Sequence, residues 1–293
     1  MSTGERTRGA VRPESVLYDA PGPRAVRRAR LLSLIVLAAF AVLVLLAARR
    51  LYEQGEFDAE LWSPLFWPGD EQFTAVWRRL LLGLSTTLQA AALTIVFSLV
   101  LGTLVTIVRL LTGRLARTPL VIVLEVLRGA PVVILIFFTA RLLPTVGIDL
   151  SLLWYLVIGL TAYNFVVIGE IVRAGVAAVP RGQVEAGLAV GLNRRQVMTI
   201  VQLPQAFRIM LPALISQLVV IVKDTSLAAI VLTGPQELLR TGRTIEQNLN
   251  NPLQTYLLIA ILYIILNGLL SRLAVSLENR LGRAASKNAR TAP

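Results

Sequence analysis

Several runs of about twenty apolar residues constrain this chain more than any other feature of its sequence. A run of that length, coiled as a helix, crosses a hydrocarbon core about 30 Å thick. Of the 293 residues, 55% are hydrophobic, above the roughly 45–50% of soluble chains. The mean hydropathy is +0.69. We therefore predict one all-α, polytopic integral membrane domain rather than several soluble domains.

The residue types needed for most catalytic and metal sites are missing from the sequence. It has no histidine and no cysteine, which removes imidazole and thiolate ligands, a Cys or His nucleophilic centre, and disulfides. It also has no GxxxxGK[ST] loop with which to hold ATP. We therefore expect a non-catalytic chain that binds no metal and no cofactor of its own.

The net charge of +12 has to be read loop by loop, because basic residues concentrate in the cytoplasmic loops of membrane proteins. Residues 1–30 are rich in Arg and Pro and are predicted to be a disordered cytoplasmic tail. The acidic stretch 52–76 should lie outside, and the basic segment 177–207 inside. Both termini are then cytoplasmic. The six expected spans cover about 31–48, 80–108, 130–144, 152–168, 209–232 and 255–277.

The first apolar run could instead be the core of a signal peptide. It is longer than the usual 7–15 residues, and Arg49 and Arg50 follow it directly, so an uncleaved span is favoured.

Residues 119–129 contain Glu125 and Arg128 and are expected to form an interfacial helix before the third span. One face of the second span is small enough for close helix packing. Its residues are Thr87, Ala91, Thr94, Ser98 and Gly102.

The segment 177–207 has the pattern of a helical hairpin. Pro180 can open a short helix of small residues, and Gly191 and Asn193 can end it, because both tolerate a left-handed conformation. A second helix is expected from Arg194 until Pro204 stops it. Such a hairpin can dock into a groove of another protein; the alternative is an ordinary loop between spans.

The same segment resembles a known family. Glu185-Ala186-Gly187, Gly191 and the run from Val201 to Pro204 resemble the EAA motif, E-A-A-x3-G-x9-I-x-L-P, of permease subunits in ATP-binding-cassette importers. Gly187 and Val201 depart from it conservatively. LRGAPVVILIFF, GEIVRAGVAAVPRGQVEAG and VKDTSLAAI resemble the polar amino acid branch of that family.

The resemblance covers about 77–281 and implies the transmembrane domain of a type I importer. The chain would be a permease subunit for polar amino acids, glutamate or glutamine first. Its hairpin would be a coupling helix on a separate ATPase that holds ATP and Mg. A solute-binding protein and a second permease, identical or homologous, complete the implied assembly. The implied coupling residues are Glu185, Ala186, Gly187, Gly191, Leu203 and Pro204.

Outside the resemblance lie the tail 1–30, an extra helix 31–50, and the C-terminal tail 282–293. An ion channel or a secondary transporter that works without ATP is the alternative function. Secondary transporters more often show inverted repeats and spans broken at mid-membrane, and neither is visible in this sequence.

Polar residues inside the fifth apolar run are candidates for the substrate path. A charge at mid-membrane costs about 2.5–3.5 kcal/mol, so Lys223 and Asp224 should face protein or water. The alternative is a structural ion pair between these residues. Other candidates are Thr225, Ser226, Gln217 and Asn164, the last of which could instead hydrogen-bond another helix. Outside this run, Glu170 and Arg173 are one turn apart and are expected to pair, and Arg128 could contact the hairpin or extend to lipid headgroups.

Overall fold

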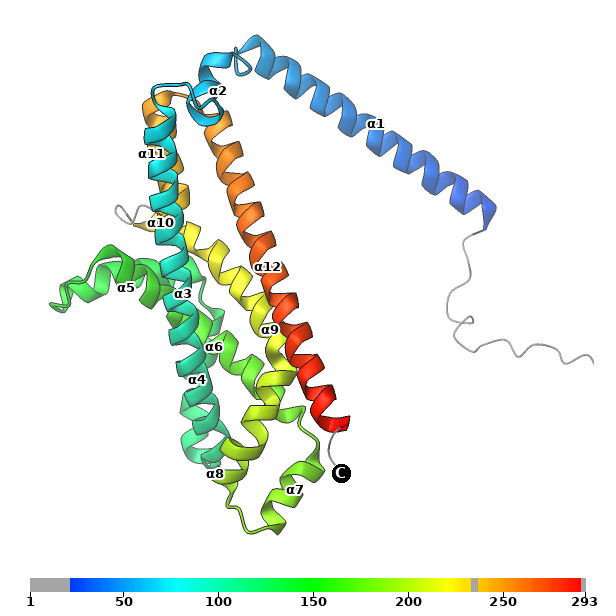
Figure 1. The fold of residues 1–293 in the computed structure, drawn as a ribbon, viewed down its shortest axis with the longest axis vertical. Coiled ribbons are helices and arrows are strands. Elements are labelled where there is room, and N and C mark those ends of the chain that lie inside the picture. The colour runs from blue at the N-terminus through cyan, green and yellow to red at the C-terminus, as the bar shows by residue number, and fades with distance from the viewer. Residues whose placement is uncertain (1–21, 233–236, 291–293) are drawn as a thin grey trace, which may run out of the picture. The chain divides into compact units, whose positions relative to one another are not determined.

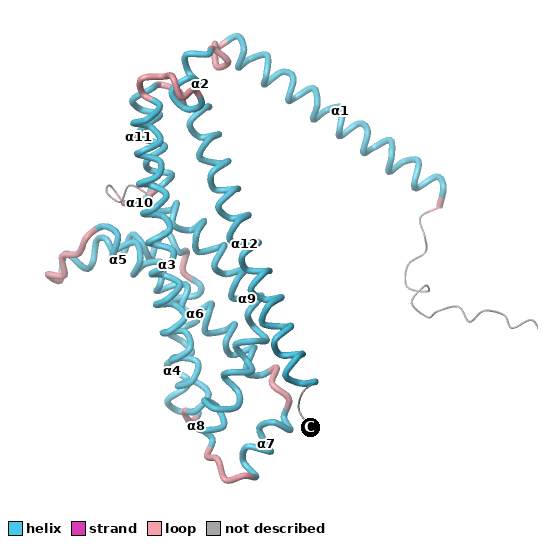
Figure 2. The backbone as a smooth tube through the Cα atoms, in the orientation of Figure 1, coloured by secondary structure: helices cyan, strands magenta, loops and turns pink. Residues whose placement is uncertain are grey.

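A computed structural model describes residues 22–232 and 237–290, and these residues are helical, without strands (Figures 1 and 2). The α-helices are α1 (Pro23–Glu53), α2 (Ala59–Phe66), α3 (Phe73–Leu111), α4 (Arg114–Gly129), α5 (Val132–Thr145), α6 (Leu152–Ala177), α7 (Arg181–Ala189), α8 (Arg194–Gln196), α9 (Leu203–Asp224), α10 (Ala228–Val231), α11 (Leu238–Leu249) and α12 (Pro252–Arg290). A π-helical segment, Val197–Gln202, precedes α9, and a 3-10 turn, Thr225–Leu227, follows it. The prediction of a disordered tail over 1–30 is wrong for residues 23–30, which form the start of α1, because Pro23 is tolerated in a first helical turn and the helix continues from it into the apolar run. The predictions for residues 1–21 and 291–293 lie outside the described residues.

Among the described residues, five helical stretches are long and apolar enough to cross a membrane. They are α1, α3, α6, the stretch Arg194–Val231 that contains α9, and the first part of α12. The pair α4 and α5 passes the same test together but is bent by 103°, and counts as a sixth span if it is one broken crossing. The chain is thus all-α and polytopic, as its apolar runs predicted.

The chain divides into two compact units, residues 1–58 and 59–293. In the first unit, α1 has no buried residue, and its apolar side chains from Leu31 to Leu46 are exposed. Lipid is the medium in which such a surface is stable. In the second unit, the helices from α2 to α12 share the buried cores.

Close contact between α3 and α6 organises the second unit, and its cause is a stripe of small residues. The five small residues predicted to share one face of α3, from Thr87 to Gly102, are all buried. A Cβ on Gly102 would come within 2.6 Å of the carbonyl oxygen of Phe165 on α6. One turn later, Thr106 donates a hydrogen bond of 2.8 Å to the carbonyl of Gly169. Backbones can approach this closely only because side chains are absent or small.

A sharp break separates α4 from α5. Ala130 has an extended backbone (φ −77°, ψ 135°), as expected for a residue that precedes proline, and Pro131 cannot continue the helical hydrogen bonding. Downstream, a Cβ on Gly159 of α6 would lie 2.6 Å from the Cα of Ile136 on α5. The helix expected at 119–129 is present as part of α4, begins earlier, and ends where the third span was expected to start. Its interfacial position stays a prediction.

Two local predictions are wrong. Pro204 does not stop the helix that follows Arg194, since it lies in the first turn of α9, where a missing N–H is tolerated. The connection before the last span, expected to be a loop, is largely the helix α11, which packs against α3 and α12. Its buried face, which includes Leu238, Thr241 and Ile245, is what the loop prediction overlooked.

Candidate functional site

The polar residues predicted to form a substrate path lie at the end of α9 and in the 3-10 turn after it. Lys223 is exposed, Asp224 and Ser226 are half-buried, and Thr225 is fully buried. Within the described part of the chain, neither Lys223 nor Asp224 belongs to an ion pair. Thr225 and Ser226 donate hydrogen bonds to carbonyls of the preceding turn, 2.7 Å each. The geometry therefore leaves the ammonium of Lys223 available to a ligand.

A cavity of about 500 Å³ opens at this point between α9 and α12. Lys223, Ser226, Tyr263 and Asn267 contribute its polar lining. Asn267 donates to the carbonyl of Tyr263 at 2.7 Å, while its side-chain oxygen is buried without a partner among the described residues. Lys223 and Asn267 thus line the same cavity, although the unpartnered oxygen of Asn267 is itself buried. Asn267 could not be predicted from the sequence, because a lone amide in an apolar run has many structural uses.

The other two predicted path residues contact each other. The side-chain amide of Gln217 on α9 donates to the side-chain oxygen of Asn164 on α6, at 2.7 Å. Asn164 is fully buried and also donates to the carbonyl of Leu160 at 2.8 Å. This is a hydrogen bond between helices, the alternative considered for Asn164, and it lies outside the cavity at Lys223.

A buried carboxylate that the sequence did not single out lies near the same cavity. Glu237 has 0% exposure and caps α11, accepting hydrogen bonds of 2.7 Å from the backbone N–H groups of Leu239 and Arg240. The hydroxyl of Tyr263 donates to it at 3.2 Å. The backbone N–H of Leu238, the residue directly after Glu237, donates to the hydroxyl of Thr87 on α3 at 3.0 Å. These contacts join α3, α11 and α12 around one carboxylate.

Burial raises the pKa of the Glu237 carboxyl above its ordinary value, against the opposing effect of its backbone hydrogen bonds. A raised pKa favours the folded protein at low pH, so this contribution to stability is lost as pH rises from about 4 through the raised pKa. We expect Glu237→Gln to flatten that part of the pH dependence of unfolding in detergent. Glu246→Gln, on the same helix but partly exposed, is the control. Identical pH profiles for wild type and Glu237→Gln would contradict the prediction.

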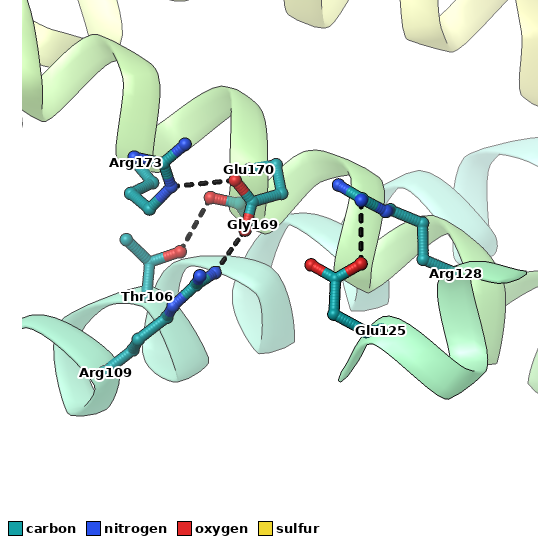
Figure 3. Close-up of polar contacts among 7 residues, drawn as sticks. All are labelled: Thr106, Arg109, Glu125, Arg128, Gly169, Glu170 and Arg173. Atoms are coloured by element: carbon teal, nitrogen blue, oxygen red, sulfur yellow. Dashed lines mark hydrogen bonds and ion pairs between the residues drawn. The ribbon is translucent and has the colours of Figure 1, made fainter. Parts of the chain in front are cut away.

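A cluster of charged side chains links the C-terminal parts of α3 and α6 (Figure 3). Glu170 pairs with Arg173 one turn later, at 2.7 Å, as predicted. It also pairs with Arg109 of α3, 61 residues away. Arg128 pairs with Glu125 on its own helix at 2.7 Å, and this pair is half-exposed. Sequence spacing predicted the pair of Glu170 with Arg173, but not the pair of Arg128 with Glu125, for which contact with the hairpin or with headgroups was expected. Nothing in the spacing could indicate the long-range pair of Arg109 with Glu170.

The segment predicted as a hairpin is a short helix, a turn and a second helix, at the lower end of the second unit in Figure 1. α7 begins directly after Pro180, and Gly191 after it has φ +88°. Asn193 and Gln196 cap the next helix reciprocally, at 2.8 and 3.0 Å. Gly187 packs against the π-helical segment, where an added Cβ would lie 3.1 Å from Val197.

The residues of the EAA-like motif divide between two faces of this hairpin. Glu185 and Ala186 are exposed, and so are the apolar side chains of Leu188 and Val190, at 45% and 77%. Gly187 and Leu203 are buried, and Pro204 is exposed. One face of α7 therefore holds the hairpin together, and the other presents apolar surface and a carboxylate to the surroundings.

The described residues contain no group of three or more His, Cys, Asp or Glu side chains that could hold a metal ion. What the fold defines is a multi-pass, helical membrane protein with a polar cavity beside a lysine and an exposed helical hairpin. Residues 95–283 match the family of binding-protein-dependent transport system inner membrane components. The chain belongs to this family, and the predicted membership among the permeases of ATP-binding-cassette importers is confirmed.

Relatives and solved structures agree with this membership. The chain is 36% identical over 235 residues to the glutamate transport system permease protein GluD of Corynebacterium glutamicum, covering 78% of this chain and 84% of that one. It is 33% identical to the glutamine transport system permease protein GlnP of Escherichia coli, covering 71% and 97%. An amino acid ABC transporter solved with histidines has the same fold, with a TM-score of 0.64, 24% identity, and coverage of 71% and 96%.

Proposed function

We propose that this chain is the permease subunit of an ATP-binding-cassette importer for polar amino acids, with glutamate or glutamine as the first candidates. The observation that carries the proposal is its similarity, over most of the chain, to permeases named for glutamate and for glutamine. The permease domain would be 77–281, preceded by the extra helix α1 (Pro23–Glu53) and followed by a tail at 282–293. The chain would be non-catalytic.

The partners follow from the division of labour in such an importer. A separate ATPase subunit would bind ATP and Mg and receive the hairpin, for which the exposed Leu188 and Val190 offer apolar contact. A solute-binding protein would deliver the amino acid from outside, and a second permease, identical or homologous, would complete the pore. Both termini and 177–207 would be cytoplasmic, and 52–76 external.

Labelling of intact cells tests this topology. An impermeant maleimide should label the variant Glu56→Cys and spare the variant Arg194→Cys. Labelling of Arg194→Cys but not of Glu56→Cys would reverse the orientation.

Uptake in reconstituted vesicles tests the function itself. The chain would be combined with its ATPase and binding protein, and labelled glutamate, glutamine, arginine and cystine would be supplied outside. We expect ATP-dependent uptake of glutamate or glutamine in preference to the other two. Uptake that continues without ATP or the ATPase would instead favour the secondary transporter.

The hairpin gives the first specific prediction. Gly191 has φ +88°, which valine adopts only with strain, although an added Cβ would meet nothing within 4 Å. We expect Gly191→Val to abolish most of the substrate-stimulated ATPase activity of the complex while the permease still inserts, because the docking surface is misdirected. Gly268→Val, in α12 with open space around it and no positive φ, is the matched control outside the hairpin. Wild-type coupling in Gly191→Val would remove the docking role.

The cavity at Lys223 gives the second prediction. We propose that the Lys223 ammonium receives a substrate carboxylate in this cavity. Lys223→Met should then lower uptake by at least tenfold, since one charge-assisted contact contributes about 1.5–3 kcal/mol. The double variant Lys223→Met with Asp224→Leu should yield folded protein but should not recover uptake. Recovery of uptake in the double variant would make the two charges structural only.

A further inference from the structure

The turn between α3 and α4 carries a basic cavity that the transport proposal does not use. It has a volume of about 470 Å³, and its polar lining comes from Arg109, Thr112, Arg114, Arg117 and Thr118. Arg114 and Arg117 are exposed and belong to no ion pair within the described part of the chain. Three guanidinium groups therefore line one small volume, and only that of Arg109 has a carboxylate partner.

Two further features of this cavity call for an anion. Arg114 and Arg117 occupy the first turn of α4, which has no acidic residue and no side-chain cap. Two cations at the positive end of a helix dipole are unfavourable unless an anion compensates them. In addition, Nε of Arg109 is buried without a hydrogen-bond partner among the described residues, although the other side of its guanidinium pairs with Glu170. An arginine with an unused donor and an uncompensated helix end thus lie beside the same cavity.

The remaining walls decide which anion fits. Val121 and Ile122 complete the lining, and α4 beyond them is strongly amphipathic. Its side chains at Leu115, Ile122 and Val126 are 94%, 59% and 67% exposed and recur at helical spacing of seven and four residues. A free phosphate ion would contact the arginines alone. A phospholipid would contact the arginines with its phosphate and the apolar face of α4 with its acyl chains.

We infer that the α3–α4 turn is a binding site for the headgroup of an anionic phospholipid, with Arg109, Arg114 and Arg117 as its ligands. The end of α3 and the hairpin lie toward the same end of the second unit (Figure 1). The inference relies on the proposed function only for placing the lipid in the cytoplasmic leaflet. Lipid binding is measured without transport, so failure of one proposal leaves the other standing.

The test titrates the purified full-length chain in neutral detergent with phosphatidylglycerol or phosphatidylcholine and counts bound lipids by native mass spectrometry. Wild type should bind phosphatidylglycerol at least tenfold more tightly than phosphatidylcholine. The double variant Arg114→Gln with Arg117→Gln should lose about thirtyfold in affinity for phosphatidylglycerol, about fivefold per arginine. Its affinity for phosphatidylcholine should not change.

Arg78→Gln with Arg79→Gln is the matched control, because it removes the same charge from exposed positions at the opposite end of α3. The control should bind phosphatidylglycerol like wild type, and Arg114→Lys with Arg117→Lys should retain most of the affinity. Equal losses in the two Gln variants, or none in Arg114→Gln with Arg117→Gln, would overturn the inference. So would displacement of phosphatidylglycerol by millimolar inorganic phosphate, which would identify a site for the free ion rather than for a lipid.

Discussion

Gly102→Leu is expected to prevent recovery of folded, monodisperse protein. The Cβ alone would lie 2.6 Å from the carbonyl oxygen of Phe165 and 2.9 Å from the backbone nitrogen of Gly169. Both atoms belong to the backbone of α6, so the clash can be relieved only by separating two helices whose contact organises the second unit. Overpacking typically costs about 1–3 kcal/mol, and a clash with backbone should exceed that range. Yield after size exclusion and the unfolding midpoint measure the effect.

The control for this change is Gly268→Leu. Gly268 also lies within a long helix, α12, but an added Cβ there would meet nothing within 4 Å. Both changes replace a helical glycine with the same apolar residue. The two variants therefore differ mainly in whether the new side chain meets a neighbouring helix. A Gly102→Leu protein that melts at the temperature of the Gly268→Leu protein would show that α3 and α6 are not in close contact.

Glu170→Gln is expected to destabilise the protein by several kcal/mol. Its carboxylate is the partner of both Arg109 and Arg173. The side chains of Arg109 and Glu170 are only 13% and 23% exposed, so removing the charge leaves a largely buried guanidinium unpaired. Breaking a fully buried pair costs about 3–5 kcal/mol, and the partial exposure places this one toward the lower end. The midpoint of thermal unfolding in detergent, compared at equal lipid content, measures the loss.

Glu125→Gln is the matched control, because it removes the same charge from a pair whose side chains are 47% and 48% exposed. An exposed pair of this kind contributes about 0–1 kcal/mol. We therefore expect a small effect there. Equal midpoints for the two variants would mean that water reaches the Arg109–Glu170 pair as freely as it reaches Glu125 and Arg128.

Much of the fold could be predicted because its causes are local. Apolar runs of sufficient length predicted helical spans, and Pro131 and Pro180 mark helix boundaries as their missing N–H groups require. The small face of α3 from Thr87 to Gly102 was visible as a repeat of three and four residues. The pair of Glu170 with Arg173 follows from one helical turn of spacing.

The errors arose where local rules conflict. Proline both stops helices and begins them, and at Pro204 the π-helical segment before it places the residue in a first turn, where it is tolerated. The connection before the last span was predicted to be a loop because it contains charged residues such as Arg240, Arg243 and Glu246. One face of α11 is nonetheless apolar and buried against α3 and α12, and that burial stabilises the helix.

By itself the sequence determined the class of protein, the order of its long apolar helices, and the motif that indicates its family, since hydropathy and turn chemistry act over a few residues. Only the tertiary structure decided which distant groups meet. It brought Arg109 to Glu170, Gln217 to Asn164, and the unremarkable Glu237 to Tyr263. It also joined Lys223 and Asn267 in one cavity. These pairings depend on how whole helices pack, and a polar side chain in an apolar run carries no local record of the partner that packing will give it.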